Sequence, residues 1–256
     1  MDKQAVRDAV WDAFDEGDQA RFPFPPHDRI PNFVGADAAA DRLAATPEWE
    51  AAATLKANPD APQLPVRRAA LRAGKTVYVA QPRLRDPNPF LRLDPEAIPP
   101  DEIDDATTVS GISEYGTPTA PEDLPHVDLV VAGSVGVTTD GARIGKGEGY
   151  SDLEWAVLRE LDAVDAETTV ATTVHELSVL DGPESAVGRD VSDGDESATL
   201  PEPDAHDVPL DLVVTPERTI RTETEYARPT GVDWDALDAP KRDAIPVLAE
   251  RAPDTD

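Results

Sequence analysis

The sequence of 256 residues contains no cysteine, one methionine and few aromatic residues, and its 23 lysines and arginines face 52 aspartates and glutamates. Without cysteine, a disulfide, a thiolate nucleophile and a cysteine-ligated zinc site are all excluded. The formal net charge of −29 makes duplex nucleic acid and anionic membranes poor partners, because the summed field repels both. An acid excess of this size with few lysines is typical of a halophilic protein, since high salt screens the repulsion between acidic side chains.

Long hydrophobic runs are also missing. The longest lies near Leu129 to Val137, well short of the roughly 20 residues that a membrane-spanning helix requires. The N-terminal segment MDKQAVRDAVWDAFDEGD has no apolar core of the kind found in signal peptides. We therefore expect a soluble, cytoplasmic protein with one domain over residues 1–256, and no membrane partner.

The first third of the chain carries helical patterns. Val6, Val10 and Phe14 share one face of an amphipathic helix over residues 2–15. The Ala-rich segment 36–45 predicts a second helix. Thr46 and Pro47 then suit the start of a third helix that continues to about residue 57, and the segment 64–74 predicts a fourth that ends at a glycine.

Short apolar runs rich in β-branched residues predict strands at 76–80, 128–137, 168–175 and 210–215. They are continuously apolar rather than alternating, so we expect a three-layer α/β/α fold in which helices cover both faces of a mainly parallel sheet. Two further segments predict loops. Residues 82–106 are rich in proline and aspartate, and the acidic residues 181–207 suit a disordered, salt-adapted insertion.

The most informative stretch is DGARIGKGEGYSDLEW, residues 140–155, in which glycines alternate between a predicted strand and a predicted helix. Ser151 and Glu154 predict a capping box at the start of that helix. Exposed loop amides at a helix N-terminus favour an anion, Arg143 and Lys146 add positive charge, and Asp152 suits a magnesium ion that bridges phosphates. The alternative is a tight connection with solvated cations. The spacing fits neither a Walker A loop nor the dinucleotide motif.

The segment GARIGKGEGYSDLE resembles the signature G-x-R-L-G-x-G-x-G-Y-Y-D of the 5-formyltetrahydrofolate cyclo-ligase family, also called the methenyltetrahydrofolate synthetases. The basic first helix, with Lys3 and Arg7, and HDVPLDLVVT at residues 206–215 are similar to family segments as well. RIPNF at 29–33 and the segment 49–71 resemble the methenyltetrahydrofolate synthase domain-containing branch more closely.

The resemblance implies a fold of the NagB/RpiA/CoA-transferase type and an ATP- and Mg²⁺-dependent cyclisation of 5-formyltetrahydrofolate to 5,10-methenyltetrahydrofolate. ATP and a reduced folate are then the partners, while the oligomeric state stays open between monomer and dimer. Carried over position by position, it implies catalytic roles for Arg143, Lys146 and Tyr150, magnesium binding by Asp152, and ATP binding by Lys3, Arg7, Gly145, Gly147 and Gly149.

Some positions differ from the family pattern. Ser151 replaces the second tyrosine, and Leu153 stands where many members have arginine. The acidic residue followed by a hydroxyl that grips folate in that family is not found between residues 34 and 70, where Pro65, Val66 and Arg67 lie roughly at its place. A non-catalytic nucleotide- or folate-binding module is therefore the alternative to an enzyme.

A local reversal of charge provides a second clue. Between Lys56 and Arg92 the chain has eight lysines and arginines against two aspartates, and Arg68, Arg72 and Lys75 recur on one helical face. Such a face suits nucleotide phosphates, the glutamate tail of a folate, or RNA. The alternative is a solvated stripe that pairs with the protein's own acids. An RNA-associated module is the weakest hypothesis, because no aromatic RNA-binding motif accompanies the basic residues.

Overall fold

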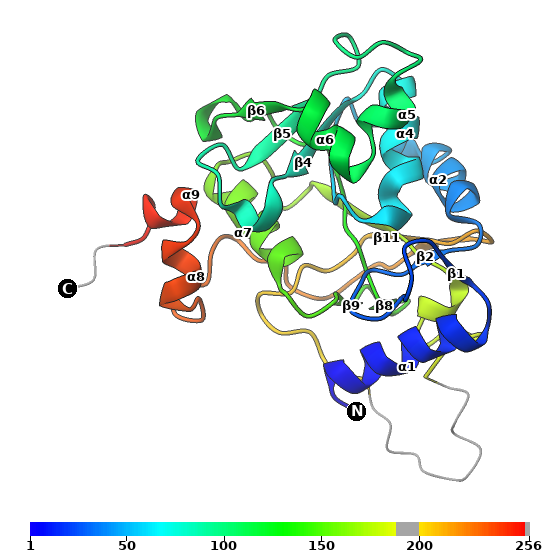
Figure 1. Cartoon of the computed structure of the whole chain (residues 1–256). Coiled ribbons are helices and arrows are strands. Elements are labelled where there is room, and N and C mark those ends of the chain that lie inside the picture. Colours follow the sequence, from blue (N-terminus) through cyan, green and yellow to red (C-terminus); the bar gives the residue numbers. More distant parts are fainter. Residues whose placement is uncertain (188–199, 254–256) are drawn as a thin grey trace.

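The computed structural model describes residues 1–187 and 200–253, which are organised around an eight-stranded sheet of order β12-β11-β10-β7-β3-β4-β5-β6 (Figure 1). The five inner strands β11, β10, β7, β3 and β4 are parallel, and the outer strands β12, β5 and β6 are antiparallel to their neighbours. The strands are β3 (Thr54–Ala57), β4 (Thr76–Ala80), β5 (Phe90–Leu93), β6 (Thr117–Thr119), β7 (Leu129–Val131), β10 (Thr169–Thr173), β11 (Leu212–Val214) and β12 (Thr219–Arg221).

Helices cover both faces of this sheet, so the expected three-layer α/β/α architecture with a mainly parallel sheet is confirmed. Along β7, Leu129 and Val131 pack into one core cluster and Val130 into the other, as the period of a strand requires. The first cluster is completed by α2 (Ala36–Ala44), α3 (Pro47–Ala51), α4 (Leu64–Arg72), α5 (Ile103–Ala106) and α6 (Val109–Tyr115). The second is completed by α7 (Tyr150–Glu160) and α9 (Pro246–Ala249), with α8 (Ala239–Asp243) beside them.

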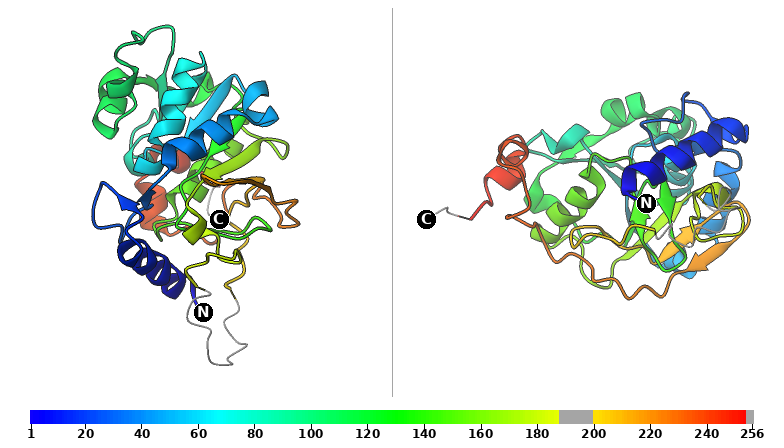
Figure 2. Two further views of the ribbon diagram at one scale, coloured as in Figure 1. Left: turned by 90° about the vertical axis from the view of Figure 1, so that its right-hand side faces the viewer. Right: turned by 90° about the horizontal axis from the view of Figure 1, so that it is seen from below.

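The N-terminal helix α1 (Lys3–Glu16) lies outside these layers, at the bottom of Figure 1 and apart from the main sheet in Figure 2. Its predicted apolar face is confirmed, because Val6, Val10 and Phe14 are buried in a third core cluster. Two small sheets lie nearby, one of β1 (Ala20–Arg21) and β2 (Asn32–Phe33), the other of β8 (Gly136–Val137) and β9 (Arg143–Ile144). Within residues 1–187 and 200–253, none of the helices has the length and apolar character that crossing a bilayer requires.

The helix predicted from Pro47 to about residue 57 is wrong in its second half. Thr46 caps the helix as expected, with its hydroxyl accepting from Trp49 N, but the helix ends at Ala51. Residues 54–57 instead form β3, which lies between β4 and β7 and is parallel to both. Burial of Leu55, Lys56 and Ala57 within the sheet outweighs the helix propensity of this Ala-rich stretch.

The predicted strands at 76–80, 168–175 and 210–215 are confirmed, while the run 128–137 is divided between β7 and β8 in two different sheets. The loop predicted over 82–106 is wrong in part, because it contains β5 and α5. A disordered insertion was predicted for residues 181–207, and within this segment Ser185 and Val187 are buried. Residues 188–199 of the segment lie outside the described residues.

The order of the parallel strands determines where a ligand site can form. From β3 the chain continues to β4 on one side, and from β7 it continues to β10 and β11 on the other. Neighbouring strands β3 and β7 therefore form a topological switch point, where the connections leave a crevice outside the carboxyl ends of the strands.

Candidate functional site

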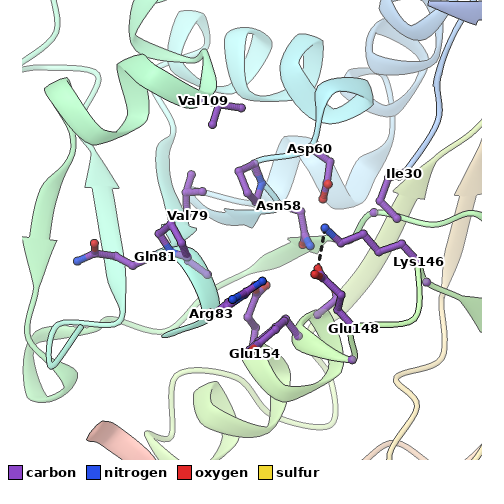
Figure 3. Close-up of a pocket in the computed structure, with 18 of the residues that line it drawn as sticks. Ile30, Asn58, Asp60, Val79, Gln81, Arg83, Val109, Lys146, Glu148 and Glu154 are labelled. Carbon is purple, nitrogen blue, oxygen red and sulfur yellow. Dashed lines mark ion pairs between the residues drawn. The ribbon is translucent and has the colours of Figure 1, made fainter. Parts of the chain in front are cut away.

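A cavity of about 360 Å³ lies at this switch point (Figure 3). Asn58 to Asp60 follow β3, Gln81 to Arg83 follow β4, and Gly133 comes two residues after β7. The opposite wall is the glycine loop, residues 145–149, together with the first turn of α7. The position is the one expected for ligand binding in an open α/β sheet.

The glycine loop ends in a backbone conformation that only glycine adopts readily. Gly147 and Gly149 have φ angles of 102° and 69°, and Gly149 is the N-cap of α7. No side chain caps the helix, so the capping box predicted from Ser151 and Glu154 is wrong. Within the described residues, the backbone N–H groups of residues 146–152 donate to no protein acceptor. They therefore form a set of donors suited to an anion.

Glu154 forms an ion pair with a residue of the sheet, so its carboxylate is not available for a capping box. Its carboxylate is buried and pairs with the Lys56 ammonium of β3, which also donates to Asn58 Oδ1 at 2.7 Å. Burial raises the pKa of Glu154, and the charge of Lys56 opposes that shift. This internal ion pair ties the first turn of α7 to the end of the central strand.

Arg143 and Asp152 form a second buried pair beneath the loop. The Arg143 guanidinium pairs with Asp152 Oδ1 and donates to Gly133 O at 3.1 Å. Burial disfavours the charged form of Arg143, but Asp152 outweighs it and raises the pKa above its ordinary value. Asp152 Oδ1 also accepts from Val208 N at 3.0 Å, whereas Oδ2 accepts no hydrogen bond from the described residues.

Lys146 and Asp60 converge on the cavity from opposite walls (Figure 3). The Lys146 ammonium pairs with Glu148 at 2.8 Å, and Asp60 lies against Gly133, where an added Cβ would come within 3.0 Å of Asp60 Oδ2. Burial raises the pKa of Asp60, while the positive charges of Lys146, Arg67 and Lys56 act in the opposite direction. The site thus contains a desolvated carboxyl surrounded by cations.

Sequence reasoning missed Asp60. The expected pattern is an acid followed by a hydroxyl within residues 34–70, whereas Asp60 is followed by Ala61, Pro62 and the buried Gln63. Asp60 lies three residues after the end of β3, and polar residues at the carboxyl end of a parallel strand face the ligand edge of the sheet. This signal was hidden because residues 54–57 were predicted as part of a helix.

The first helix supplies one of its two predicted cations to the loop. Arg7 Nε donates to Gly145 O at 2.7 Å, and the guanidinium lies close to Gly147. Lys3 does not line the cavity. Its ammonium is 2.7 Å from Asp204 and 2.5 Å from Asp207, two acids of the segment after the undescribed residues.

Tyr150 lines the cavity as expected, but its ring has a neighbour that the sequence did not indicate. Lys241 Nζ lies 4.8 Å from the centre of the Tyr150 ring and donates to Glu148 O at 3.1 Å. No local pattern links residues that are 93 positions apart in the chain.

The predicted basic face of α4 does not reach the cavity. Arg68 and Arg72 both pair with Asp104, at 3.0 and 2.6 Å, and Lys75 donates to Ala52 O. These pairs fit the alternative of a solvated stripe that pairs with the protein's own acids.

Two other cations of the segment 56–92 lie inside the protein or at the cavity. Arg67 is buried, donates to Asp60 O and Thr107 O at 3.1 Å each, and burial lowers its pKa to about 10. Arg83 lies at the cavity itself. Part of the positive charge between residues 56 and 92 therefore lies in or beside the cavity.

Comparison with known proteins identifies the family of the chain. The family model described as the 5-formyltetrahydrofolate cyclo-ligase family matches residues 15–184. Methenyltetrahydrofolate synthase domain-containing proteins of Mus musculus and Homo sapiens are 38% and 35% identical over 97% of the chain. The chain spans about three fifths of these relatives, 62% and 61% of their lengths. An NMR structure of Aquifex aeolicus 5,10-methenyltetrahydrofolate synthetase has a TM-score of 0.49 at 17% identity, covering 90% of this chain and 97% of that one. On the match to the family model, the chain belongs to the 5-formyltetrahydrofolate cyclo-ligase family.

Proposed function

We propose that the protein catalyses the ATP- and Mg²⁺-dependent cyclisation of 5-formyltetrahydrofolate to 5,10-methenyltetrahydrofolate. The observation that carries the proposal is a single cavity with two chemically different walls. One wall contains the glycine loop with its free backbone amides and Lys146, and the other combines apolar side chains with the half-buried Asp60. Membership of the family supplies the class of reaction.

In the proposed reaction, the formyl oxygen attacks the γ-phosphorus of ATP and ADP leaves. N10 of the folate then attacks the activated formyl carbon and releases its proton, the ring closes, and phosphate departs with the former formyl oxygen. Such a sequence needs positioning and stabilisation of negative charge rather than a protein nucleophile. The lack of cysteine is compatible with it.

The wall formed by the glycine loop and the first turn of α7 suits a triphosphate. The amides of residues 146–152 are free to donate, Lys146 extends over the cavity, and Arg7 supports the loop through Gly145 O. Asp152 has one carboxylate oxygen held by Arg143 and one available. One carboxylate oxygen together with phosphate oxygens is a ligand set that Mg²⁺ uses, and the bound ion would neutralise phosphate charge.

The opposite wall fits a flat heterocycle that carries N–H donors. Val79, Leu91 and Ile112 line it with apolar surface, and Tyr150 of the glycine-loop wall adds an aromatic ring to the same cavity. Asp60 offers a carboxyl group at its inner end, where a partner that donates hydrogen bonds would offset the cost of burial. A pterin ring has these properties.

The test is to mix the purified protein with 5-formyltetrahydrofolate and Mg-ATP and follow the near-ultraviolet absorbance of the methenyl product. The measurement is made at low and at high salt, because the net charge of −29 suits a salt-rich medium. A Lys146→Met variant serves as the control and should lose most of the signal. Absence of product from the wild-type protein under all salt conditions would contradict the proposal.

A non-catalytic binding module is the second candidate, because Ser151 lines the cavity where the family pattern has a second tyrosine. A smaller side chain leaves the reacting groups less confined. Calorimetry separates the two candidates, since a module of this kind should bind ATP without binding reduced folate. The basic face of α4 adds no support for RNA binding, because Arg68 and Arg72 are paired with Asp104.

A further inference from the structure

The C-terminal arm, residues 228–249, lies against α7 and beyond the segment that matches the family model. Trp155 Nε1 donates to Pro229 O at 2.9 Å, and Val232 N donates to Glu160 Oε1 at 3.0 Å. Val247 and Leu248 are buried in the same core cluster as α7. The arm is therefore packed onto the helix that begins at the glycine loop.

A second cavity, of about 600 Å³, lies between the C-terminal arm and α7. Leu153, Ala156 and Leu237 contribute apolar surface to it. Gly149 and Asp152 line this cavity and also the first one. The end of the glycine loop can thus be approached from two sides, and the arm forms the wall of the second side.

Lys241 is the cation that the arm places at this junction. Its ammonium donates to Glu148 O at 3.1 Å, lies 4.8 Å from the centre of the Tyr150 ring, and would lie 3.6 Å from a Cβ on Gly149. In the described part of the chain, no carboxylate lies within ion-pair distance of it, whereas Lys146 is paired with Glu148. The positive charge of Lys241 therefore faces the loop without a compensating acid, in a protein of net charge −29.

We propose that Lys241 is a phosphate-positioning residue, which the C-terminal arm adds to the glycine loop and which contacts the phosphates of a bound nucleoside triphosphate. The inference rests on the proposed function, because it requires a polyphosphate at this loop. A lysine ammonium has three donors, so the bond to Glu148 O leaves two for phosphate oxygens. Its contact with Tyr150 keeps the ammonium at the loop, so little side-chain freedom is lost on binding.

The test compares Lys241→Met, which keeps an unbranched stem and removes the ammonium, with Arg242→Met on the same helix, where Arg242 pairs with its neighbour Asp243. Calorimetry measures the binding of tripolyphosphate, ATP and adenosine to the full chain in the presence of Mg²⁺. We expect Lys241→Met to weaken tripolyphosphate and ATP about 5- to 20-fold and to leave adenosine unchanged. Arg242→Met should bind all three as the wild type does, and Lys241→Arg should restore most of the affinity.

The outcomes separate the two proposals. If the wild type binds tripolyphosphate and Lys241→Met binds it equally well, the assignment of Lys241 is overturned and the proposed function is not affected. If Lys241→Met loses affinity but the wild type forms no methenyl product, cyclisation is overturned and the assignment stands. Failure of the wild type to bind either polyphosphate overturns both. A role in folding alone would lower the unfolding midpoint of Lys241→Met and leave the tripolyphosphate affinity unchanged, which also overturns the assignment.

Discussion

The glycine loop and helix α4 both carry several positive side chains, yet these side chains have different surroundings. At the loop, Arg143 and Lys146 lie beside free backbone amides and line a cavity. On α4, Arg68 and Arg72 share Asp104 on the outside of the molecule. A run of cations in a sequence is therefore a candidate ligand site only where the fold places it beside a cavity and free hydrogen-bond donors.

Burial separates the two regions energetically. Lys56 and Arg143 are almost fully buried, and each is compensated by a carboxylate within the protein. Side chains of Arg68 and Arg72 are partly exposed, so water and salt already screen their attraction to Asp104. Substitutions should thus have large effects near the cavity and small ones on α4.

The largest effect is expected from Lys56→Met. Removing the ammonium leaves Glu154 buried without its partner, and breaking a buried pair in this way costs about 3–5 kcal/mol of unfolding free energy. Urea unfolding measures the loss. The double variant Lys56→Met/Glu154→Leu should recover most of it, because an apolar pair of similar size replaces both charges. A single-variant loss below about 1 kcal/mol would show that the pair does not hold α7 to the sheet.

The second-largest effect is expected on the affinity for ATP. Lys146→Met should weaken ATP about 10- to 100-fold, since a charge-assisted contact to phosphate contributes about 1.5–3 kcal/mol. Arg72→Met removes a cation of the α4 face and should change the affinity less than about twofold. Calorimetry with Mg-ATP makes both measurements. Equal losses in the two variants would remove the distinction between the regions.

Asp60→Asn should increase the free energy of unfolding at neutral pH and weaken the binding of reduced folate. Because burial raises the pKa of Asp60, the folded state keeps this proton to a higher pH than the unfolded chain. The unfolding free energy of the wild type therefore falls as the pH rises from about 4 through the raised value. The amide has no charge to desolvate, so the variant should be about 0.5–2 kcal/mol more stable at neutral pH.

Two measurements check the prediction for Asp60→Asn. The stability advantage of Asp60→Asn should disappear in acid, where Asp60 of the wild type is protonated. Binding of reduced folate should weaken at neutral pH, while binding of ATP is retained. A variant that is less stable than the wild type at every pH would mean that Asp60 serves the fold rather than a ligand.

The smallest effect is expected on α4 itself. Arg68→Ala removes one of the two partners of Asp104 at a partly exposed position, and exposed pairs contribute about 0–1 kcal/mol. The change should therefore be within about 0.5 kcal/mol and should shrink further in concentrated salt. If urea unfolding showed a loss of more than about 2 kcal/mol in the free energy of unfolding, this face would stabilise the fold as much as the buried pairs do.

Local signals in the chain were sufficient for much of the fold. The apolar face of α1, the cap at Thr46 and the strand at 76–80 each depend on neighbours a few residues away, and each is confirmed. The second half of the helix predicted after Pro47 failed for the opposite reason. Its residues form β3 because two distant strands pair with it on both sides.

The same division applies to the site. The glycine spacing, Arg143, Lys146 and Tyr150 lie within eight positions of one another, so a short signature indicated them together. Asp60 escaped because its relation to the loop exists only across the sheet. Glu154 was assigned to a capping box because its true partner, Lys56, lies 98 positions away.

By itself, the sequence determined the acidic character of the protein, several of its helices and strands, and a glycine loop at a helix start, because composition and short spacings encode these properties. The tertiary structure decided which charges are compensated and which face a cavity. Asp60, Lys146 and Lys241 come from three distant segments, and only the packing of α7 between the sheet and the C-terminal arm brings them to one loop. Coulombic and desolvation energies depend on distance and burial in space, and neither quantity can be read from separation along the chain.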